Sequence, residues 1–343
     1  MLVLRSPTAR PAAGFLAMLC VAAGLSAPPP QAQQEEAPRL LLAFASFRDR
    51  PLHPRTYFYE HDGAGQGRAA GGIEPVNLRV DTHPTLGSGG RICAVASEVE
   101  NQPSDLLLWD LAARQIIPSP PGLNSDTVEI GAALSGNGEW LASATWRREG
   151  YPGGWNLLLY HLKERKVVPA PINTDEDESQ PTLSADGRWI AFSSNRPGGA
   201  GLSDLYLYDR GRGQYRPLPG LNTAYRETDP ALSADGNWLA FTSNRPGGVG
   251  ALDIYLYNLR LDRLTPLPGV NGTGPDQTPA LSQDGRFLVS VAERAGGTGE
   301  RDIYLYDRAL SRTIPTPGLN TASEEFDPAV WDRRAGDGKE PLP

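Results

Sequence analysis

The sequence predicts an all-β protein, a six-bladed β-propeller with four antiparallel strands in each blade. A phrase of the form Leu-Ser-Ala-Asp-Gly occurs at residues 183–187 and 232–236, and with Gln in place of Ala at 281–285. Weaker copies begin at Leu86, Leu134 and Val330, so that six copies follow one another at spacings of 48 or 49 residues. A repeat of this length, with several short strands in each unit, is typical of β-propellers and not of helical solenoids.

Residues 227–275 show how one repeat forms a blade. Strand-like segments cover 230–233, 238–242, 253–257 and 263–267, and Gly, Pro, Asn and Asp separate them. The second and third segments are apolar at nearly every position, without the alternation of a sheet that has one face in water. We therefore expect each sheet to be covered on both faces by neighbouring blades.

The two ends of the repeat region predict how the ring closes. The repeats begin with a second strand at 40–44 and a third at 56–59, without a first strand before them. The absent strand occurs instead at 328–331. A first blade built from both ends of the chain would leave no exposed edge strand. We therefore expect a single propeller over residues 39–332.

The segments outside the propeller indicate export. Arg5 and Arg10 precede an apolar run at 14–25, which has the length of a signal-peptide core and is short for a membrane span. We expect a signal peptide at 1–27, with its cleavage site not fixed, a flexible leader at 28–38 and a polar tail at 333–343. The mature protein would then be periplasmic, without a transmembrane segment.

Three motifs resemble those of the TolB-like propellers, a WD-repeat-like family of bacterial envelopes. The motifs occupy 229–236, 239–245 and 253–257, and the resemblance extends over residues 39–332. It implies a β-propeller in the cell envelope. TolB also carries an α/β domain before its propeller, and here we expect only the short leader, so the chain resembles a propeller-only relative. The known partners of TolB are therefore not transferred to it.

Two sets of charged residues recur at fixed places in the repeat. One is a carboxylate before each innermost strand, and the other is an arginine between the second and third strands. The carboxylates are Asp81, Glu129, Glu178, Glu227, Asp276 and Glu325; the arginines are Arg48, Arg147, Arg196, Arg245 and Arg294. Strand direction places both sets at one face of the ring, with the carboxylates as an acidic ring at the channel mouth. The arginines pair with these carboxylates, or with Asp204, Asp253 and Asp302, in a structural role. Alternatively, both sets form a charged collar for a cation or a basic peptide.

The repeats differ most in the loop of the third blade. This loop contains Trp146, Arg147, Arg148, Tyr151 and Trp155, residue types that dominate protein interfaces and sugar-stacking surfaces. The two tryptophans would equally serve as a small core for the loop itself. Tyr225 and Arg226, between two blades, are expected at the same face. An acidic stretch at 175–178 lacks the spacing of a known calcium loop, so that calcium is at most a weak expectation and no other cofactor is predicted.

Composition and motifs restrict the function. Formal net charge is −8 and the repeats carry no basic stripe, which argues against nucleic acid as a partner. No known catalytic motif occurs, so we expect no enzyme. The leading hypothesis is a monomeric interaction module that binds an envelope protein or peptide. A polysaccharide-binding or polysaccharide-cleaving propeller is the second hypothesis, and a calcium-stabilised scaffold is the third.

Overall fold

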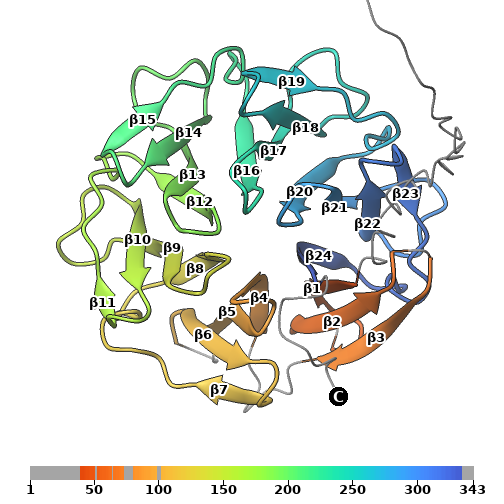
Figure 1. Ribbon diagram of the computed structural model, residues 1–343, viewed down its shortest axis with the longest axis horizontal. Helices are drawn as coiled ribbons and strands as arrows, with labels where there is room; N and C mark the ends of the chain where they lie inside the picture. The colour runs from red at the N-terminus through yellow and green to blue at the C-terminus, as the bar shows by residue number, and fades with distance from the viewer. Residues whose placement is uncertain (1–38, 51, 64, 73–79, 99–101, 334–343) are drawn as a thin grey trace, which may run out of the picture. The chain divides into compact units, whose positions relative to one another are not determined.

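The computed structural model describes residues 39–50, 52–63, 65–72, 80–98 and 102–333. Six four-stranded antiparallel sheets radiate from a central channel, one innermost strand per sheet facing the channel (Figure 1). The predicted six-bladed propeller is confirmed. The predicted signal peptide at 1–27, the leader at 28–38 and tail residues 334–343 lie outside the described residues. The described residues contain no helix with the length and hydropathy of a membrane span.

The strands follow the predicted order within each blade. The innermost strands are β4 (Val80–Gly87), β8 (Glu129–Leu134), β12 (Glu178–Leu183), β16 (Glu227–Leu232), β20 (Asp276–Leu281) and β24 (Glu325–Asp332). The second strands are β1 (Leu40–Ser46), β5 (Ile92–Glu98), β9 (Trp140–Trp146), β13 (Trp189–Ser194), β17 (Trp238–Ser243) and β21 (Phe287–Ala292).

The third and outer strands complete the sheets. The third strands are β2 (Arg55–His61), β6 (Asp105–Asp110), β10 (Trp155–His161), β14 (Asp204–Asp209), β18 (Asp253–Asn258) and β22 (Asp302–Asp307). The outer strands are β3 (Gly67–Gly72), β7 (Gln115–Ile117), β11 (Lys166–Val167), β15 (Gln214–Arg216), β19 (Arg263–Thr265) and β23 (Arg312–Ile314). Most of these outer strands are only two or three residues long, which limits the free hydrogen-bonding edge that each blade exposes.

The core lies between the blades, as the continuous apolar segments predict. In one inter-blade cluster, Leu205 and Leu207 of β14 pack with Phe241 of β17 and Tyr257 of β18. All of these side chains are buried. Each sheet therefore buries both faces only because another sheet lies on either side of it.

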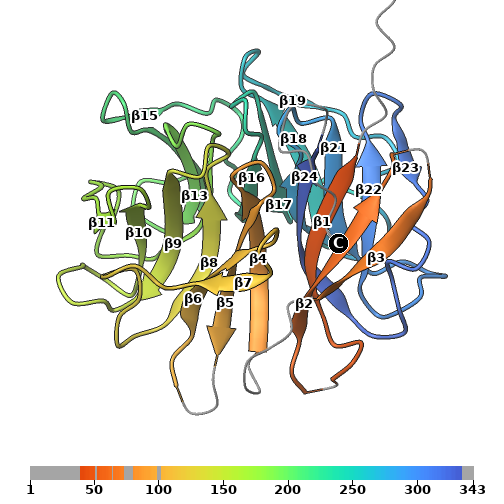
Figure 2. The same ribbon diagram turned by 60° about the horizontal axis from the view of Figure 1, so that its bottom comes forward.

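The ring closes through the first blade. Strand β24 pairs antiparallel with β1, joining Leu40 to Asp332 and Ser46 to Glu325 (Figures 1 and 2). The predicted closure by a C-terminal strand is confirmed. Arg333 extends the contact, because its backbone N–H donates to the carbonyl of Arg39 and its guanidinium lies 3.3 Å from Glu60.

The repeated Ser-Ala-Asp-Gly phrase closes the turn after each regular innermost strand. Ser184 donates its hydroxyl to Asp186 at 2.6 Å and accepts the backbone N–H of Trp189 at 3.0 Å. Gly187 has a φ of 65°, which a residue with a Cβ rarely adopts. The phrase is therefore turn chemistry.

Each innermost strand also contains an irregularity near its start. The antiparallel register shifts by one residue in each of them, at a bulge. A residue with positive φ lies at each bulge, and five of the six precede a proline: His83, Gln180, Asp229, Thr278 and Asp327, with Gly131 as the sixth.

Candidate functional site

The recurring arginines and carboxylates pair with each other at one face of the ring. The guanidinium of Arg196 lies 3.0 Å from Glu178, and that of Arg245 lies 3.0 Å from Glu227. The same arrangement joins Arg294 to Asp276 at 2.9 Å and Arg48 to Glu325 at 3.2 Å. Each of these arginines also donates to a backbone carbonyl of the preceding inter-blade loop, as Arg245 does to Leu221. The arginine therefore links two neighbouring loops.

The carboxylates are saturated with internal hydrogen bonds. Glu227 accepts the backbone N–H and the hydroxyl of Thr223, at 2.9 and 2.6 Å, and the hydroxyl of Ser243 at 2.9 Å. Its side chain is fully buried, as are those of Glu129, Glu178 and Glu325. The described members of this set therefore do not form an exposed acidic ring at the channel mouth. The side chain of Asp81, the sixth member, lies outside the described structure.

Burial dominates the electrostatics of two of these groups. The pKa of Glu129 is raised by burial, which outweighs its bonds to Ser125 and Thr145 and the charge of Arg148. The pKa of Asp276 is raised for the same reason, despite its pairing with Arg294. These carboxylates are thus costly to bury, and their hydrogen-bonded partners are needed to hold them.

The third blade corrects one assignment. Arg148, and not Arg147, occupies the place of the repeated arginine: its guanidinium lies 3.6 Å from Glu129 and donates to the carbonyl of Leu123 at 3.1 Å. The reason is an extra cross-strand pair, Trp146 opposite Trp155, which lengthens the β9–β10 hairpin by one residue on each side. Arg147 follows with a φ of 48°, and its exposed guanidinium rests 5.1 Å from the centre of the Trp146 ring.

The aspartates that open the regular third strands hold their own loops. Asp253 accepts the backbone N–H groups of Val249 and Gly250, each at 3.1 Å. A Cβ on Gly248 would overlap the Asp253 carboxylate, which explains the glycine at that place in the loop. Asp302 accepts Thr298 and Gly299 in the same way, and Asp204 accepts Gly201. The loop arginines therefore pair with the buried carboxylates of the innermost strands and not with these aspartates.

The aromatic residues of the β9–β10 loop are half-buried. The Trp146 and Trp155 rings lie 5.3 Å apart, and Trp155 packs against an inter-blade cluster. Tyr151 packs against the neighbouring cluster, and burial raises its pKa. Of the predicted contact residues in this loop, only Arg147 is exposed. The tryptophans mainly form the core of the loop.

Tyr225 and Arg226 are exposed on the loop before β16. Arg226 forms an isolated parallel bridge with Ser203, so that this loop runs beside the β13–β14 loop. The β13–β14 loop exposes Leu202, at 68%, and Tyr225 is exposed at 42%. Val249, on the β17–β18 loop, is exposed at 62%. We define the loop rim as five exposed residues on adjoining loops of this face: Arg147, Leu202, Tyr225, Arg226 and Val249.

The loops that carry the loop rim contact one another in succession. Trp155 donates its backbone N–H to Asp177, in the loop before β12, at 2.9 Å. Asp177 donates its own N–H to Asn195, at the start of the β13–β14 loop, and Arg226 donates likewise to Asn244. The loop rim therefore lies on one chain of hydrogen-bonded loops.

Comparisons with solved structures identify the fold. TolB from Acinetobacter baumannii superimposes with a TM-score of 0.60 at 17% identity, over 86% of this chain and 67% of that one. A putative TolB from Agrobacterium tumefaciens gives 0.55 at 15% identity, over 86% and 99%. The chain has a TolB-like propeller fold. An oligogalacturonate lyase in complex with manganese also matches, with a TM-score of 0.54 at 14% identity, over 80% and 72%. No protein-family model matches the sequence, and no curated protein does.

The TolB-like propeller also uses residues that the sequence analysis missed. In the inter-blade loops that the structure describes in full, an asparagine binds both backbone groups of one third-strand residue, as Asn222 does with Leu205 at 3.0 Å each way. Asn124, Asn173, Asn271 and Asn320 do the same. Their regular spacing before each carboxylate was the available signal.

The acidic stretch at 175–178 is divided between two roles. Glu178 is buried in its ion pair, and Asp177 accepts the Trp155 N–H, whereas Asp175 and Glu176 are exposed. Within the described part of the chain, no group of three His, Cys, Asp or Glu residues is arranged to hold a metal ion.

Proposed function

We propose that this protein is an exported, non-catalytic binding module of the bacterial cell envelope that engages a protein or peptide partner through the loop rim. The TolB-like fold and the predicted signal peptide at 1–27 support a periplasmic location. We take the unit to be a monomer.

The main support is the contrast between repeated and non-repeated residues at this face. The described carboxylates of the innermost strands, and the arginines paired with them, are consumed by bonds that hold the loops. The loop rim, by contrast, exposes a tyrosine, two arginines and two aliphatic side chains on adjoining loops. Tyrosine and arginine dominate the energetics of protein interfaces, and exposed aliphatic groups beside them mark contact surfaces.

A crosslinking pull-down of the tagged mature protein tests the proposal. Leu202→Ala, Tyr225→Ala and Arg226→Ala, combined in one variant, should lose an envelope protein that the wild type captures. The matched control carries Leu261→Ala and Leu310→Ala, two exposed residues in the turns between third and outer strands, at the opposite face. Equal capture by the loop-rim variant and the control would place the interface elsewhere and refute the proposal.

A second candidate is the binding or cleavage of polysaccharide. The structural likeness to oligogalacturonate lyase favours it, together with the paired Trp146 and Trp155 and the Arg147 guanidinium over the Trp146 ring. Quenching of tryptophan fluorescence by oligogalacturonates, lost in Trp146→Ala, would support this candidate. Absence of quenching across acidic and neutral oligosaccharides would argue against it.

A further inference from the structure

The turns between third and outer strands gather cations on one face of the ring. In five blades these turns, taken with the first residue of the outer strand, are residues 111–115, 162–166, 210–214, 259–263 and 308–312, and we call them the basic turns. Their exposed cations are Arg114, Lys163, Arg165, Lys166, Arg212, Arg260, Arg263 and Arg312. Glu164 and Asp262 are their only exposed carboxylates. The basic turns are therefore cationic in a chain whose formal net charge is −8.

The fold brings the basic turns together although they stand about one repeat apart in the sequence. Strand direction places them at the face that carries the Ser-Ala-Asp-Gly turns, and the outer strands lie at the periphery of the ring (Figure 1). A backbone bond fixes each basic turn to the turn after the innermost strand of its own blade. The N–H of Arg210 donates to the carbonyl of Arg188 at 2.9 Å, and that of Arg308 to Arg286 at 2.9 Å. The N–H groups of Leu111, Leu162 and Leu259 donate in the same way. The cations are thus presented by a backbone that is held in place.

Most of these cations are not used by ion pairs inside the propeller. The buried aspartates that end the third strands pair with other arginines: Arg188 lies 2.6 Å from Asp209, and Arg286 lies 2.9 Å from Asp307. Lys166 pairs with Glu164, and Arg212 lies 3.7 Å from Asp209. The cations that form no salt bridge within the described residues are Arg114, Lys163, Arg165, Arg260, Arg263 and Arg312. These charges remain free to attract an anionic partner.

Exposed leucines accompany the cations in two adjacent blades. Leu261, in the turn between β18 and β19, is exposed at 58%, and Leu310, in the turn between β22 and β23, is exposed at 51%. Leu261 directly follows Arg260, and Leu310 stands two positions before Arg312. Aliphatic side chains beside lysine and arginine are typical of surfaces that lie on lipid bilayers, where the cations meet headgroups and the aliphatic groups enter the acyl boundary.

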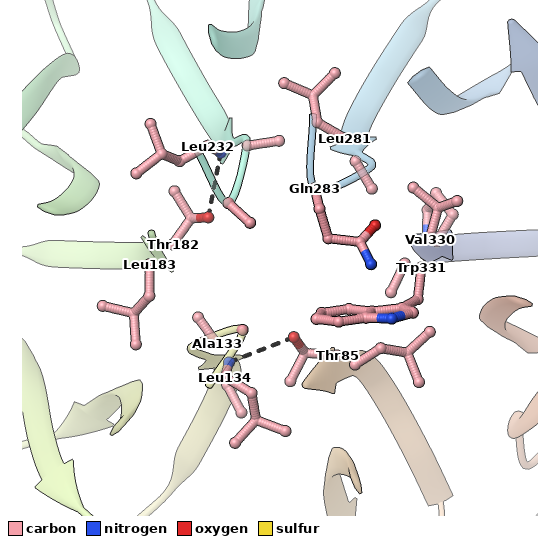
Figure 3. Close-up of a pocket in the computed structure, with 18 of the residues that line it drawn as sticks. Thr85, Ala133, Leu134, Thr182, Leu183, Leu232, Leu281, Gln283, Val330 and Trp331 are labelled. Carbon is pink, nitrogen blue, oxygen red and sulfur yellow. Dashed lines mark hydrogen bonds between the residues drawn. The ribbon is translucent and has the colours of Figure 1, made fainter. Parts of the chain in front are cut away.

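The cavity in the channel at this end of the ring offers no site for a small anion. It has a volume of about 190 Å³ and is bordered by the second halves of the innermost strands, and none of the described residues that line it is ionisable. Figure 3 shows the hydroxyl of Thr182 already bonded to the backbone N–H of Leu232. Gln283 is bonded to the backbone of Asp332. A pocket for a small anion needs polar groups that converge on it. Cations spread over five turns suit an extended anionic surface instead.

We infer that the basic turns dock the propeller on a membrane surface rich in anionic phospholipids, with Leu261 and Leu310 inserted between the headgroups. The free guanidinium and ammonium groups bind lipid phosphates, and the negative surface potential attracts them from a distance. The two leucines favour lipid over a soluble polyanion, which has no apolar layer to receive them. The loop rim lies at the opposite face, so a docked propeller would hold it away from the membrane. The inference does not depend on the proposed partner surface.

Cosedimentation of the mature protein with lipid vesicles tests the inference. The mature form is used because the apolar run at 14–25 would bind vesicles by itself. Vesicles of equal parts phosphatidylglycerol and phosphatidylcholine should bind the protein, and added salt should weaken this binding. Vesicles of phosphatidylcholine alone should not bind it. Arg263→Gln/Arg312→Gln should weaken binding by about tenfold to thirtyfold, the contribution of two cations near an anionic surface. Leu261→Ala/Leu310→Ala should weaken it by about tenfold.

Matched controls separate this face from the rest of the surface. Arg147→Gln/Arg226→Gln removes two exposed charges from the loop rim, and Leu202→Ala/Val249→Ala removes exposed aliphatic groups there; neither variant should change vesicle binding. No binding to anionic vesicles, equal binding to both kinds of vesicle, or equal losses in the loop-rim controls would overturn the inference. Soluble polygalacturonate is the competing polyanion. If it displaced the protein from vesicles while the leucine variant bound them in full, the basic turns would belong to a soluble polyanion and lipid docking would be refuted.

Discussion

The blade of β12–β15 and the blade of β8–β11 hold their loops by the same device with different residues. In the first, Ser194 and Arg196 bind Glu178. In the second, Thr145 bonds to Glu129 at 3.1 Å and Arg148 lies near it, beyond an added pair of tryptophans. The comparison shows that the buried carboxylate is the constant feature. The loop around it can lengthen, and the displaced Arg147 is then left exposed.

The largest expected effect distinguishes the buried carboxylate from its exposed neighbour. Glu178→Lys should lower the free energy of unfolding by about 3–5 kcal/mol or more, because Arg196 would lose its partner and a second cation would be buried beside it. Glu176→Lys, two residues away and exposed, should change it by less than about 0.5 kcal/mol. Denaturant unfolding measures both. Similar effects of the two substitutions would mean that the ion pair does not hold the loop.

Within the blade of β8–β11, the two adjacent arginines should differ clearly in their contributions to stability. Arg148→Ala should cost about 2–3 kcal/mol of unfolding free energy, since Glu129 keeps its hydroxyl partners but loses its cation. Arg147→Ala should cost about 0.5 kcal/mol, the worth of an exposed cation–π contact. If Arg147 proved the more important for stability, the assignment of Arg148 to the repeated role would be wrong.

The closing blade offers a smaller test. In the regular blades, turns bind one another by backbone bonds, as Ala185 does with Ala234 at 2.8 Å. At the closure, the Gln283 side chain replaces that contact and bonds both backbone groups of Asp332, at 3.0 and 2.8 Å. Gln283→Ala should therefore lower stability by about 1–2 kcal/mol. Gln283→Glu keeps the acceptor alone and should fall between wild type and alanine.

The smallest effect concerns pH. The raised pKa of Asp229 means that the folded state binds more protons than the unfolded state above the unfolded value of about 3.9. Unfolding free energy therefore decreases as pH rises from that value through the folded pKa. The Asp229→Asn variant lacks this titration, so its unfolding free energy relative to that of the wild type should be higher at pH 7 than at pH 4. Urea unfolding at several pH values measures it, and a difference between variant and wild type that does not change with pH would contradict it.

Much of the fold was predictable because the repeat encodes it locally. Each copy of the repeat combines a turn phrase, such as 232–236, with an apolar strand, such as β17. The spacing of the turn phrases gives the repeat length, and the apolar strands indicate which segments are buried. The strand at 328–331 revealed how the ring closes. The family resemblance agreed with both. These features depend on residue type and spacing alone.

The candidate site was less predictable because it depends on small shifts of the backbone. Linear alignment placed Arg147 in the repeated position, and only the Trp146–Trp155 pair moves Arg148 there. Likewise, a residue before proline is expected in extended conformation, so the sequence did not indicate that Asp229 and Thr278 adopt positive φ. The repeated carboxylates can be buried because hydroxyl groups and loop residues around them donate hydrogen bonds to them. The sequence analysis had not identified these partners.

Pairing of the last strand with the first has a consequence for the order of folding. Ser46 and Glu325 meet although they stand 279 positions apart. Contacts at such separations form slowly, because a long loop must close before they stabilise anything. Until β24 arrives, β1 has an unpaired edge that offers hydrogen bonds to any extended chain. The final step of folding is then the step most exposed to aggregation, and the rate of ring closure would govern how much of the protein reaches the folded state.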